Sequence, residues 1–473
     1  MQGTWFEPWP GKILHAAEQL SPVRDMLTDE VTKAAAKDSP VVKGNALLAL
    51  SSLAVVVSKH EASLSSDSEG VLEVQPNFLS MKAWVSMVFD TLLVIVDSHY
   101  QPRGQLFSWF YYKSYSGENT ASAIARSAAA TALSLLVPVF IISCKEKVEE
   151  ILNMLTARLP GKPSADESQA VQIHMGLALG MFLSRLCEEK LSDISGQQMN
   201  LLLMKSLDAL ENCCFDTSLE YKYADSIPSL ILRDCTGCIL GVGLVLSLMS
   251  HSSRTESRVH VAASLRKLSV YLDDSGGQSR TFQEVLAYTL SCVCTSAFSA
   301  GIIEAVEAED IMNKLRLLVE NNQQTSGFAL ALGNIVHGLS VCGHGKAEDL
   351  GNKLLPAWIR IVLTEGTSTM LCLAALHGMV ALVGSEGDVM QLKSEAIQSS
   401  HFQGRLNEVI RTLTQVISVS GVIGLQSNAV WLLGHLHLST LSSNQSRTSV
   451  HISDSGCPEI ASPENGGLIL EAQ

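Results

Sequence analysis

The chain has 473 residues and a formal net charge of −14, and 47% of its residues are hydrophobic while only 17% are charged. This composition is too apolar for a chain that is disordered throughout, and its acidity argues against a free-standing nucleic-acid binder. The 33 glycines, 13 prolines and 11 cysteines exclude a collagen and a small disulfide-rich scaffold.

Residues 1–60 are predicted to form N-terminal helical repeats. The first residues carry neither the basic nor the apolar segment of a signal peptide, so we expect a cytosolic, reducing compartment. The cysteines agree with this expectation because most of them stand inside Leu, Ala and Val runs, where a reduced cysteine behaves as a small hydrophobic residue.

Residues 77–158 are predicted to form further helical repeats, interrupted by an aromatic loop at 100–117. Seven aromatic residues fall between positions 100 and 115 of an otherwise aromatic-poor chain. These rings either seal the edge between repeats or anchor a protein partner, and the two interleaved cations are too few for a phosphate track on RNA. The candidate partner-binding residues are Trp109, Phe110, Tyr111 and Tyr112.

A short apolar phrase with a small central residue recurs along residues 171–441. Its central glycines are Gly180, Gly241, Gly333, Gly378 and Gly434. A degenerate copy centred on Ser291 divides the longest interval. The resulting spacing of about 40 to 60 residues is typical of HEAT or armadillo helix pairs, and a glycine at the centre lets neighbouring helices approach closely.

The segments between these phrases have the spacing of amphipathic helices. Apolar stripes occur at Val148, Ile151, Leu152, Leu155 and Leu159, at Val261, Leu265, Leu268 and Leu272, and at Leu406, Ile410, Leu413 and Ile417. We therefore predict an all-α fold, a HEAT/armadillo-like α-solenoid of stacked helix pairs in which apolar inner helices alternate with amphipathic outer ones. Residues 442–473 are rich in Ser, Asn, Gly and Pro and are expected to form a disordered C-terminal tail.

One cysteine motif could indicate a redox pair or a zinc site. Cys235-x-x-Cys238 has the required spacing, but a zinc site needs two more ligands, and the nearest pair, Cys213-Cys214, is adjacent rather than spaced. The motif also opens an apolar inner helix. We therefore expect structural cysteines and assign no metal and no cofactor.

Histidines near glycines could be metal ligands or part of the core. In His435-x-His437 the two rings would point to opposite sides of a helix, which disfavours a shared metal ion. Cys342-Gly-His344 is also expected to be structural, because no histidine pair at i, i+4 spacing accompanies it. His337 and His377 are expected either to be satisfied by a neighbouring carbonyl or to line a concave surface.

The remaining motifs also favour structure over catalysis. Gly237-x-x-x-Gly241 lacks the strand and the lysine of a phosphate loop, so we expect helix packing. The carboxylates at 304, 307, 309 and 310 lie at one helix start and are expected to form a solvated face. No combination of nucleophile, base and orienting group is supported by the spacing, and we expect a protein that is not an enzyme.

Three uncharged runs, near 127–144, 235–253 and 412–446, raise the alternative of a polytopic membrane protein. The mean hydropathy of +0.22 is high for a soluble protein. However, the runs mix Ser, Thr, Gly, Gln and Asn with aliphatic residues, and the flanking cations show no one-sided bias. Helices that are apolar all round are also what the inner layer of a solenoid requires, which is the interpretation we prefer.

Long strings between about 176 and 441 resemble the focadhesin family. The strings that carry the resemblance are 219–223, 235–244, 260–274, Gly327-Phe-Ala-Leu-Ala-Leu-Gly-Asn-Ile-Val-His-Gly-Leu339 and Val430-Trp-Leu-Leu-Gly-His-Leu-His437. Residues 1–175 are compatible with the same family, whereas His451 onward does not resemble its continuation. The resemblance therefore implies a central fragment or an alternatively ended form.

The resemblance implies a large helical protein without catalytic activity, acting in the cytosol and at focal adhesions and linked to tumour suppression. It implies vinculin and the superkiller complex, which feeds the RNA exosome, as protein partners. We expect neither direct nucleic-acid binding nor a membrane span. No residue of this chain inherits a catalytic role.

Overall fold

The computed structural model describes residues 40–64, 81–96, 120–143, 146–160, 169–188, 196–215, 235–252, 254–384 and 400–436. These ranges consist of helices and turns and contain no strand, which confirms the predicted all-α fold. The contacts divide the chain into two compact units, Met1–Met249 and Ser250–Gln473. The boundary between the two units falls inside the predicted solenoid segment, 171–441. The predicted tail, 442–473, and the predicted aromatic loop, 100–117, lie outside the described residues.

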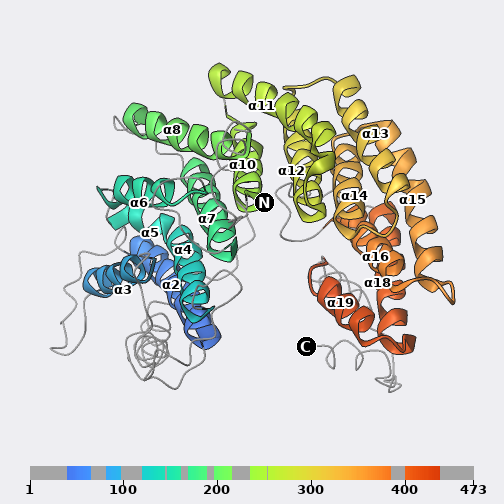
Figure 1. Cartoon of the computed structure of the whole chain (residues 1–473), viewed down its shortest axis with the longest axis horizontal. Coiled ribbons are helices and arrows are strands. Elements are labelled where there is room, and N and C mark those ends of the chain that lie inside the picture. The colour runs from blue at the N-terminus through green and yellow to red at the C-terminus, as the bar shows by residue number, and fades with distance from the viewer. Residues whose placement is uncertain are drawn as a thin grey trace, which may run out of the picture. The chain divides into compact units, whose positions relative to one another are not determined.

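The first unit is a stack of helices in two layers (Figure 1). Helices α2, α4, α7 and α10 pack on one another in succession, and α3, α6 and α8 lie beside them. This is the predicted alternation of inner and outer helices. The helices are α2 (Pro40–Leu64), α3 (Met81–Val96), α4 (Thr120–Leu135), α5 (Val137–Ser143), α6 (Glu146–Ala157), α7 (Gln169–Glu188), α8 (Gly196–Phe215) and α10 (Thr236–Met249).

Helices α7 and α10 share the most extensive contact of the first unit, and glycines make it possible. A Cβ atom added at Gly237 would overlap the carbonyl oxygen of Ile173, and one added at Gly241 would lie 2.8 Å from the carbonyl oxygen of Gly176. The predicted packing role of Gly237-x-x-x-Gly241 is therefore confirmed.

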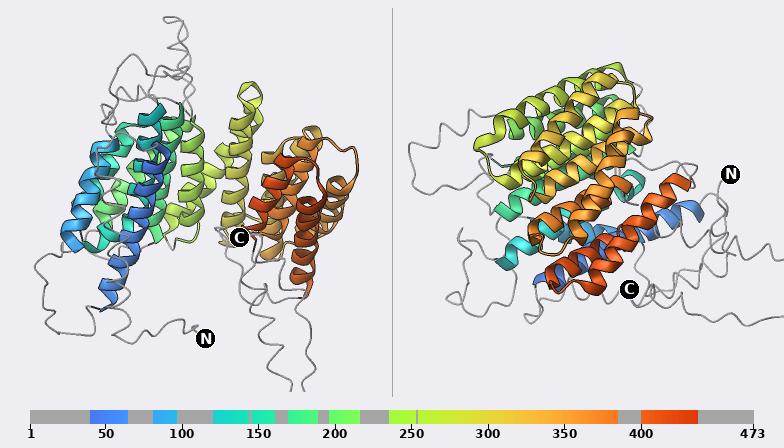
Figure 2. Two further views of the ribbon diagram at one scale, coloured as in Figure 1. Left: turned by 90° about the horizontal axis from the view of Figure 1, so that it is seen from below. Right: turned by 90° about the vertical axis from the view of Figure 1, so that its right-hand side faces the viewer.

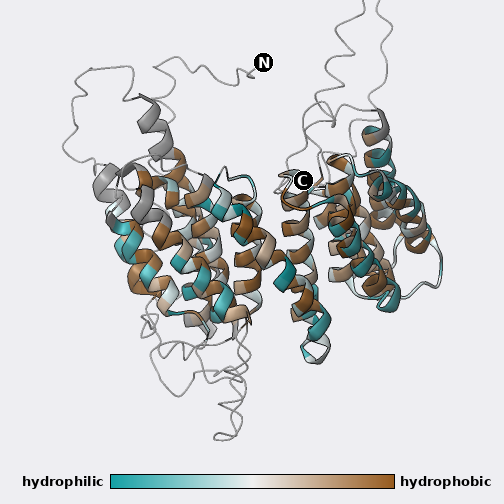
Figure 3. Ribbon diagram, turned by 90° about the horizontal axis from the view of Figure 1, so that it is seen from above, coloured by the Kyte–Doolittle hydropathy of each residue, from teal (hydrophilic) through white to brown (hydrophobic). Residues whose placement is uncertain are grey.

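The outer helix α6 shows why its sequence is amphipathic. Val148, Ile151, Leu152 and Leu155 of α6, and Leu159 in the turn after it, are each at most 1% exposed, as the stripe predicted. Colouring by hydropathy shows hydrophobic residues along inner and outer helices alike (Figure 3). At about 25 cal/mol per Å² of apolar surface removed from water, this burial is the main stabilising term for each layer.

The second unit repeats the same plan, and short turns join its successive helices from α11 to α16 (Figure 2). Helices α12, α14, α16 and α19 form the inner layer, and α11, α13, α15 and α18 form the outer one. The elements are α11 (Thr255–Asp274), the short 3-10 helix η2 (Ser275–Gly277), α12 (Arg280–Ser299), α13 (Ala305–Asn321), α14 (Ser326–Val341), α15 (Gly345–Leu363), α16 (Thr369–Val383), α18 (Ser400–Val419) and α19 (Ile423–Leu433).

Hydrogen bonds between successive pairs measure the repeat directly. Asn334 Nδ2 on α14 donates to Ser291 Oγ on α12 at 2.9 Å, across 43 residues. Lys314 Nζ on α13 donates to the carbonyl oxygen of Ser269 on α11 at 3.0 Å, across 45 residues. The degenerate copy of the repeat at Ser291 is therefore an inner helix in register with its neighbour, and the predicted period is confirmed in this unit.

The turns between helix pairs end in glycines that adopt left-handed backbone conformations. Gly301 follows α12 with φ 64°, and Gly343 follows α14 with φ 86°. In both turns the residue after the glycine donates its backbone N–H to the carbonyl oxygen five residues earlier. Ile302 N donates to Ala297 O at 2.8 Å, and His344 N donates to Leu339 O at 3.0 Å. This is the Schellman arrangement, which a side chain with a Cβ would strain.

Ion pairs join successive outer helices. Glu307 on α13 accepts from Arg266 on α11, with a shortest N–O distance of 2.9 Å, and Glu309 accepts from Lys346 on α15 at 2.8 Å. Both pairs are exposed to solvent, which agrees with the predicted solvated face. The pairing itself was not predicted, because the cations come from helices about forty residues away, which local spacing does not reveal.

The buried stripe of α18 differs by one residue from the prediction at two points. Leu406 and Leu413 are fully buried, as expected. Val409 and Val416, at most 4% exposed, complete the line, whereas Ile410 and Ile417 are only partly buried. Because adjacent residues are both apolar here, sequence spacing alone could not choose between them.

Candidate functional site

The predicted partner-binding residues, Trp109, Phe110, Tyr111 and Tyr112, lie outside the described residues. Their role as a protein-binding anchor stays a prediction. The described part of the chain offers two other candidates, an exposed apolar face on α19 and a group of cysteine thiols.

Helix α19 is apolar on both sides. Its inward side is set by Leu425, Ala429 and Leu432, which are at most 7% exposed and pack toward α16 and α18. Its outward side carries Ile423, 79% exposed, and Trp431, 59% exposed. We define the α19 surface as Val419, Val422, Ile423, Val430 and Trp431, all of which are exposed. A helix that is apolar all round normally has a covering on every side.

The indole of Trp431 is held by neighbouring rings. His435 lies one turn along, with ring centroids 4.3 Å apart in an edge-on arrangement, and His377 on α16 lies 6.4 Å away. Burial lowers the pKa of His377 because it disfavours the imidazolium, and a hydrogen bond with Asn428 opposes part of this effect. The indole therefore stands beside a neutral ring, so the patch combines apolar area with a fixed aromatic side chain.

Two other histidines have the structural roles that the sequence favoured. His337 is 8% exposed, and its Nδ1 lies 3.1 Å from the carbonyl oxygen of Leu382. His344 precedes α15, where its side chain accepts a hydrogen bond from Ala347 N, and its Nε2 lies 3.3 Å from the carbonyl oxygen of Ala305. His337 is therefore satisfied by a carbonyl, as predicted. His344 caps a helix, which spacing did not foresee.

Cys213, Cys235 and Cys238 bring three sulfur atoms together where α8 ends and α10 begins. Cys213 Sγ lies 3.5 Å from Cys238 Sγ and 3.9 Å from Cys235 Sγ. Cys235 Sγ also donates to the carbonyl oxygen of Cys213 at 3.2 Å, and Cys213 Sγ to that of Pro160 at 3.5 Å. We call these three residues the thiol cluster.

The thiol cluster has a gradient of burial and protonation. Cys235 is partly exposed, Cys213 is 6% exposed and Cys238 is fully buried. The pKa of the Cys238 thiol is raised well above its ordinary value by its hydrogen bond to Cys213, by burial and by repulsion from the neighbouring sulfurs. Sequence reasoning set the Cys213-Cys214 pair aside because it is not spaced as a ligand pair. The sequence feature that could have indicated the contact is the position of Cys213 about twenty residues before Cys235, on two helices that pack together.

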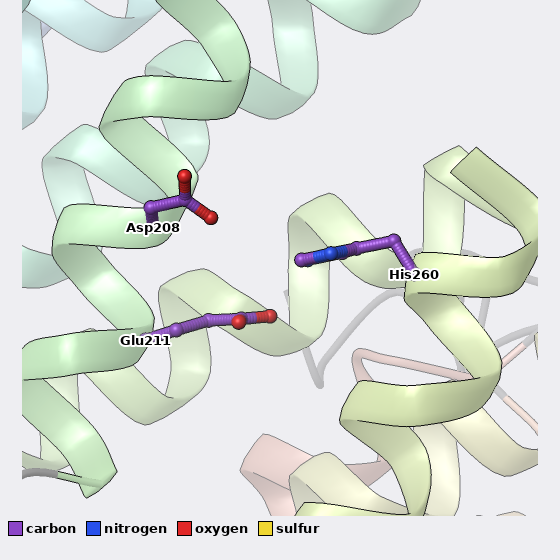
Figure 4. A group of neighbouring side chains, drawn as sticks. All are labelled: Asp208, Glu211 and His260. Atoms are coloured by element: carbon purple, nitrogen blue, oxygen red, sulfur yellow. The ribbon is translucent and has the colours of Figure 1, made fainter. Parts of the chain in front are cut away.

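Figure 4 shows three further side chains of ligand type. Asp208 and Glu211 project from successive turns of α8, and His260 projects from α11. Glu211 is 5% exposed, whereas Asp208 is exposed. Asp208 and Glu211 belong to the first unit and His260 to the second, and no site is assigned to them.

The described residues include one helix that is long and apolar enough to cross a membrane, Ala170–Cys187, with a mean hydropathy of 1.3. This helix is α7, and 61% of that window is buried inside the structure, where it packs on α4 and α10. None of the three predicted uncharged runs forms a single spanning helix in the described ranges. The first is divided between α4 and α5, α10 has 14 residues, and the third is divided between α18 and α19.

Comparison with known proteins decides the family. A sequence profile described as Focadhesin matches residues 312–461. Focadhesin from Homo sapiens is 90% identical over 437 residues, and Focadhesin from Mus musculus is 85% identical over 437 residues. The chain belongs to the focadhesin family.

The focadhesin relatives are much longer than this chain. The human and mouse matches each cover 92% of the chain and 24% of the relative, so the chain spans about a quarter of their length. Focadhesin from Danio rerio is 56% identical over 429 residues, covering 90% of the chain and 23% of the relative. No solved structure matches the chain. The family profile includes the whole α19 surface and extends to residue 461, so the expectation that the resemblance stops before His451 is wrong for residues 451–461.

Proposed function

We propose that this chain is a noncatalytic scaffold that binds protein partners, and that the α19 surface is one of its binding faces. The observation that carries the proposal is Trp431, which is 59% exposed although it is flanked by apolar neighbours and by two rings that fix its position. Tryptophan is strongly enriched among the residues that dominate binding energy in protein interfaces. Stacked helix pairs also present extended surfaces, which suits a scaffold better than a small-molecule enzyme.

The proposed partners are vinculin at focal adhesions and the cytosolic superkiller complex of RNA decay. The family resemblance supports both, and the name Focadhesin, which the relatives carry, supports an association with adhesions. The net charge of −14 favours neutral or basic surfaces on the partner.

A binding experiment with matched variants tests this proposal. The purified chain is immobilised, and vinculin and the superkiller complex are passed over it separately. We expect Ile423→Ala with Trp431→Ala to weaken binding of at least one partner by tenfold or more. Val259→Ala with Val306→Ala removes two side chains of similar exposure, 64% and 65%, from other helices and should leave binding unchanged.

Two outcomes overturn the proposed surface. Equal binding by both double variants would show that the α19 surface is not used. Loss of binding only when Trp109, Phe110, Tyr111 and Tyr112 are changed together to Ala would assign binding to the 100–117 loop instead.

A separate outcome concerns the scaffold as a whole. Retention of the chain in membranes after carbonate extraction would overturn the scaffold proposal and favour a membrane protein.

A further inference from the structure

The thiol cluster has no part in partner binding at α19, yet its geometry is suited to chemistry. We infer that Cys213 and Cys235 form an oxidisable site at which hydrogen peroxide is reduced and a Cys213–Cys235 disulfide is formed. The inference rests on three sulfur atoms in contact, ordered from partly exposed to fully buried.

Cys235 is placed to react first. It is the residue immediately before α10, and its carbonyl oxygen accepts from Ile239 N at 3.0 Å, so its side chain lies at the amino end of the helix. In the structure Cys235 is a thiol that donates to the carbonyl oxygen of Cys213, and the partial positive charge of the helix end stabilises the negative charge that develops on its sulfur when the proton leaves. Cys235 is partly exposed, whereas Cys213 and Cys238 are buried, so peroxide reaches Cys235 before the other two.

Cys213 is placed to resolve the oxidised residue. Its sulfur lies 3.9 Å from that of Cys235 and has to approach to about 2.05 Å for a disulfide. Cys213 lies in the last turn of α8, and Cys235 precedes the first turn of α10. Side-chain rotation at these two helix ends can supply an approach of this size.

The chemical balance is complete with peroxide as the oxidant. The Cys235 thiolate attacks one peroxide oxygen, the O–O bond breaks, and the proton taken up by the departing oxygen gives water and a sulfenic acid. The sulfur of Cys213 then attacks the sulfur of the sulfenic acid, the S–O bond breaks, and the hydroxyl leaves as water with the proton of Cys213. Two thiols lose two hydrogens and one peroxide becomes two waters.

Cys238 is the less effective partner. Its sulfur is 3.5 Å from that of Cys213, but burial and hydrogen bonding keep it protonated, and a thiol attacks a disulfide far more slowly than a thiolate. The Cys213–Cys235 disulfide is therefore the product that accumulates. It joins the ends of α8 and α10 across 22 residues of sequence.

Peptide mapping of the oxidised chain tests the assignment. The reduced full-length chain is exposed to an equimolar amount of hydrogen peroxide, alkylated and digested without reductant. We expect the loss of two alkylable thiols, a cross-linked peptide containing Cys213 and Cys235, and recovery of both thiols with dithiothreitol. Cys213→Ser should leave a sulfenic acid at Cys235 that a dimedone probe captures, and Cys238→Ser should still form the disulfide.

Cys372→Ser is the matched control, because Cys372 is a buried thiol on α16 in the second unit. It should give the same yield of cross-linked peptide as the natural chain. The inference is overturned if Cys213 and Cys235 of the unmodified chain are oxidised no faster than Cys294. It is also overturned if the purified chain contains one zinc ion that Cys213→Ser removes, which would make the cluster a metal site. The oxidation rates and the zinc content are both measured on the natural chain, so they can overturn the inference even where a variant fails to fold, and they do not depend on partner binding.

Discussion

Gly180 of α7 and Gly241 of α10 are in direct backbone contact: a Cβ atom at Gly180 would overlap the Cα of Gly241. Helices whose contact residues carry side chains pack with their axes about 8 to 10 Å apart, and removing the side chains allows a closer approach. The two central glycines of successive repeats thus meet at one point of the inner layer. A glycine in mid-helix costs about 1 kcal/mol in helix propensity, so its presence here is explained by packing.

Replacing Gly180 with Ala should destabilise the first unit. The methyl group would improve helix propensity, but it has no space unless α7 and α10 move apart, and overpacking of this kind costs about 1–3 kcal/mol. The measurement is the free energy of unfolding from chemical denaturation, followed by helical circular dichroism. We expect a lower midpoint for Gly180→Ala than for the natural chain.

Gly276→Ala provides the control, because nothing lies within 4 Å of a Cβ built at that glycine. Its unfolding midpoint should stay within error of the natural one. An unchanged midpoint for Gly180→Ala would mean that the two helices are not packed backbone to backbone.

Two buried serines of α12 should respond in opposite directions to the same substitution. Ser296 Oγ is buried and makes no hydrogen bond, so Ser296→Ala should stabilise the chain by about 1 kcal/mol. Ser291 Oγ accepts from Asn334 Nδ2 and donates to the carbonyl oxygen of Tyr288, so Ser291→Ala should destabilise by about 1 kcal/mol. Thermal unfolding of the two variants side by side measures the difference. The same sign of change in both would contradict the hydrogen-bond assignment.

Lys314 ties α13 to α11 more firmly than a simple surface pair. Its Nζ donates to Asp273 Oδ2 at 2.6 Å, to Ser269 Oγ at 2.8 Å and to Ser269 O at 3.0 Å, and its side chain is only 26% exposed. Lys314→Met keeps most of the stem and should cost about 1 kcal/mol. The cost should shrink as sodium chloride is raised, because salt screens the ion pair. Lys267→Met, at an exposed position on α11, should show a smaller cost, and equal costs would contradict the role of the network.

The repeat architecture could be predicted from the sequence because its signals are local. Stripes such as Val261, Leu265, Leu268 and Leu272 are visible within twenty residues, and all four residues are buried. Four of the central glycines, Gly180, Gly241, Gly333 and Gly378, lie in close helix contacts, as predicted. The prediction is wrong for Gly434, which ends α19 and meets only atoms of its own helix. What the sequence could not supply was the partner of each side chain about 42 to 45 residues away, such as Asn334 for Ser291. Those pairings depend on how successive hairpins are stacked.

The candidate sites were less predictable for the same reason. Val430 and Trp431 belong to a phrase expected to form a buried inner helix, yet both are exposed, because burial depends on a neighbour that no residue of the phrase specifies. The thiol cluster depends on α8 and α10 folding back on each other. Cys213 and Cys235 are 22 residues apart, and their contact follows from tertiary packing rather than from a motif.

His377 should make the stability of the second unit depend on pH. Because burial lowers its pKa below the ordinary value of 6.5, the unfolded chain takes up a proton before the folded chain does as the pH falls. The free energy of unfolding should therefore be unaffected by this group well above pH 6.5 and should decrease below it. Urea unfolding of the natural chain and of His377→Gln at several pH values between about 7.5 and 5 measures this difference.

The His377→Gln variant should lose less stability on acidification than the natural chain. Asn428→Ala should lose more, since it removes the hydrogen bond that favours the charged ring. Parallel profiles for His377→Gln and the natural chain would show that the ring titrates alike in the folded and unfolded states.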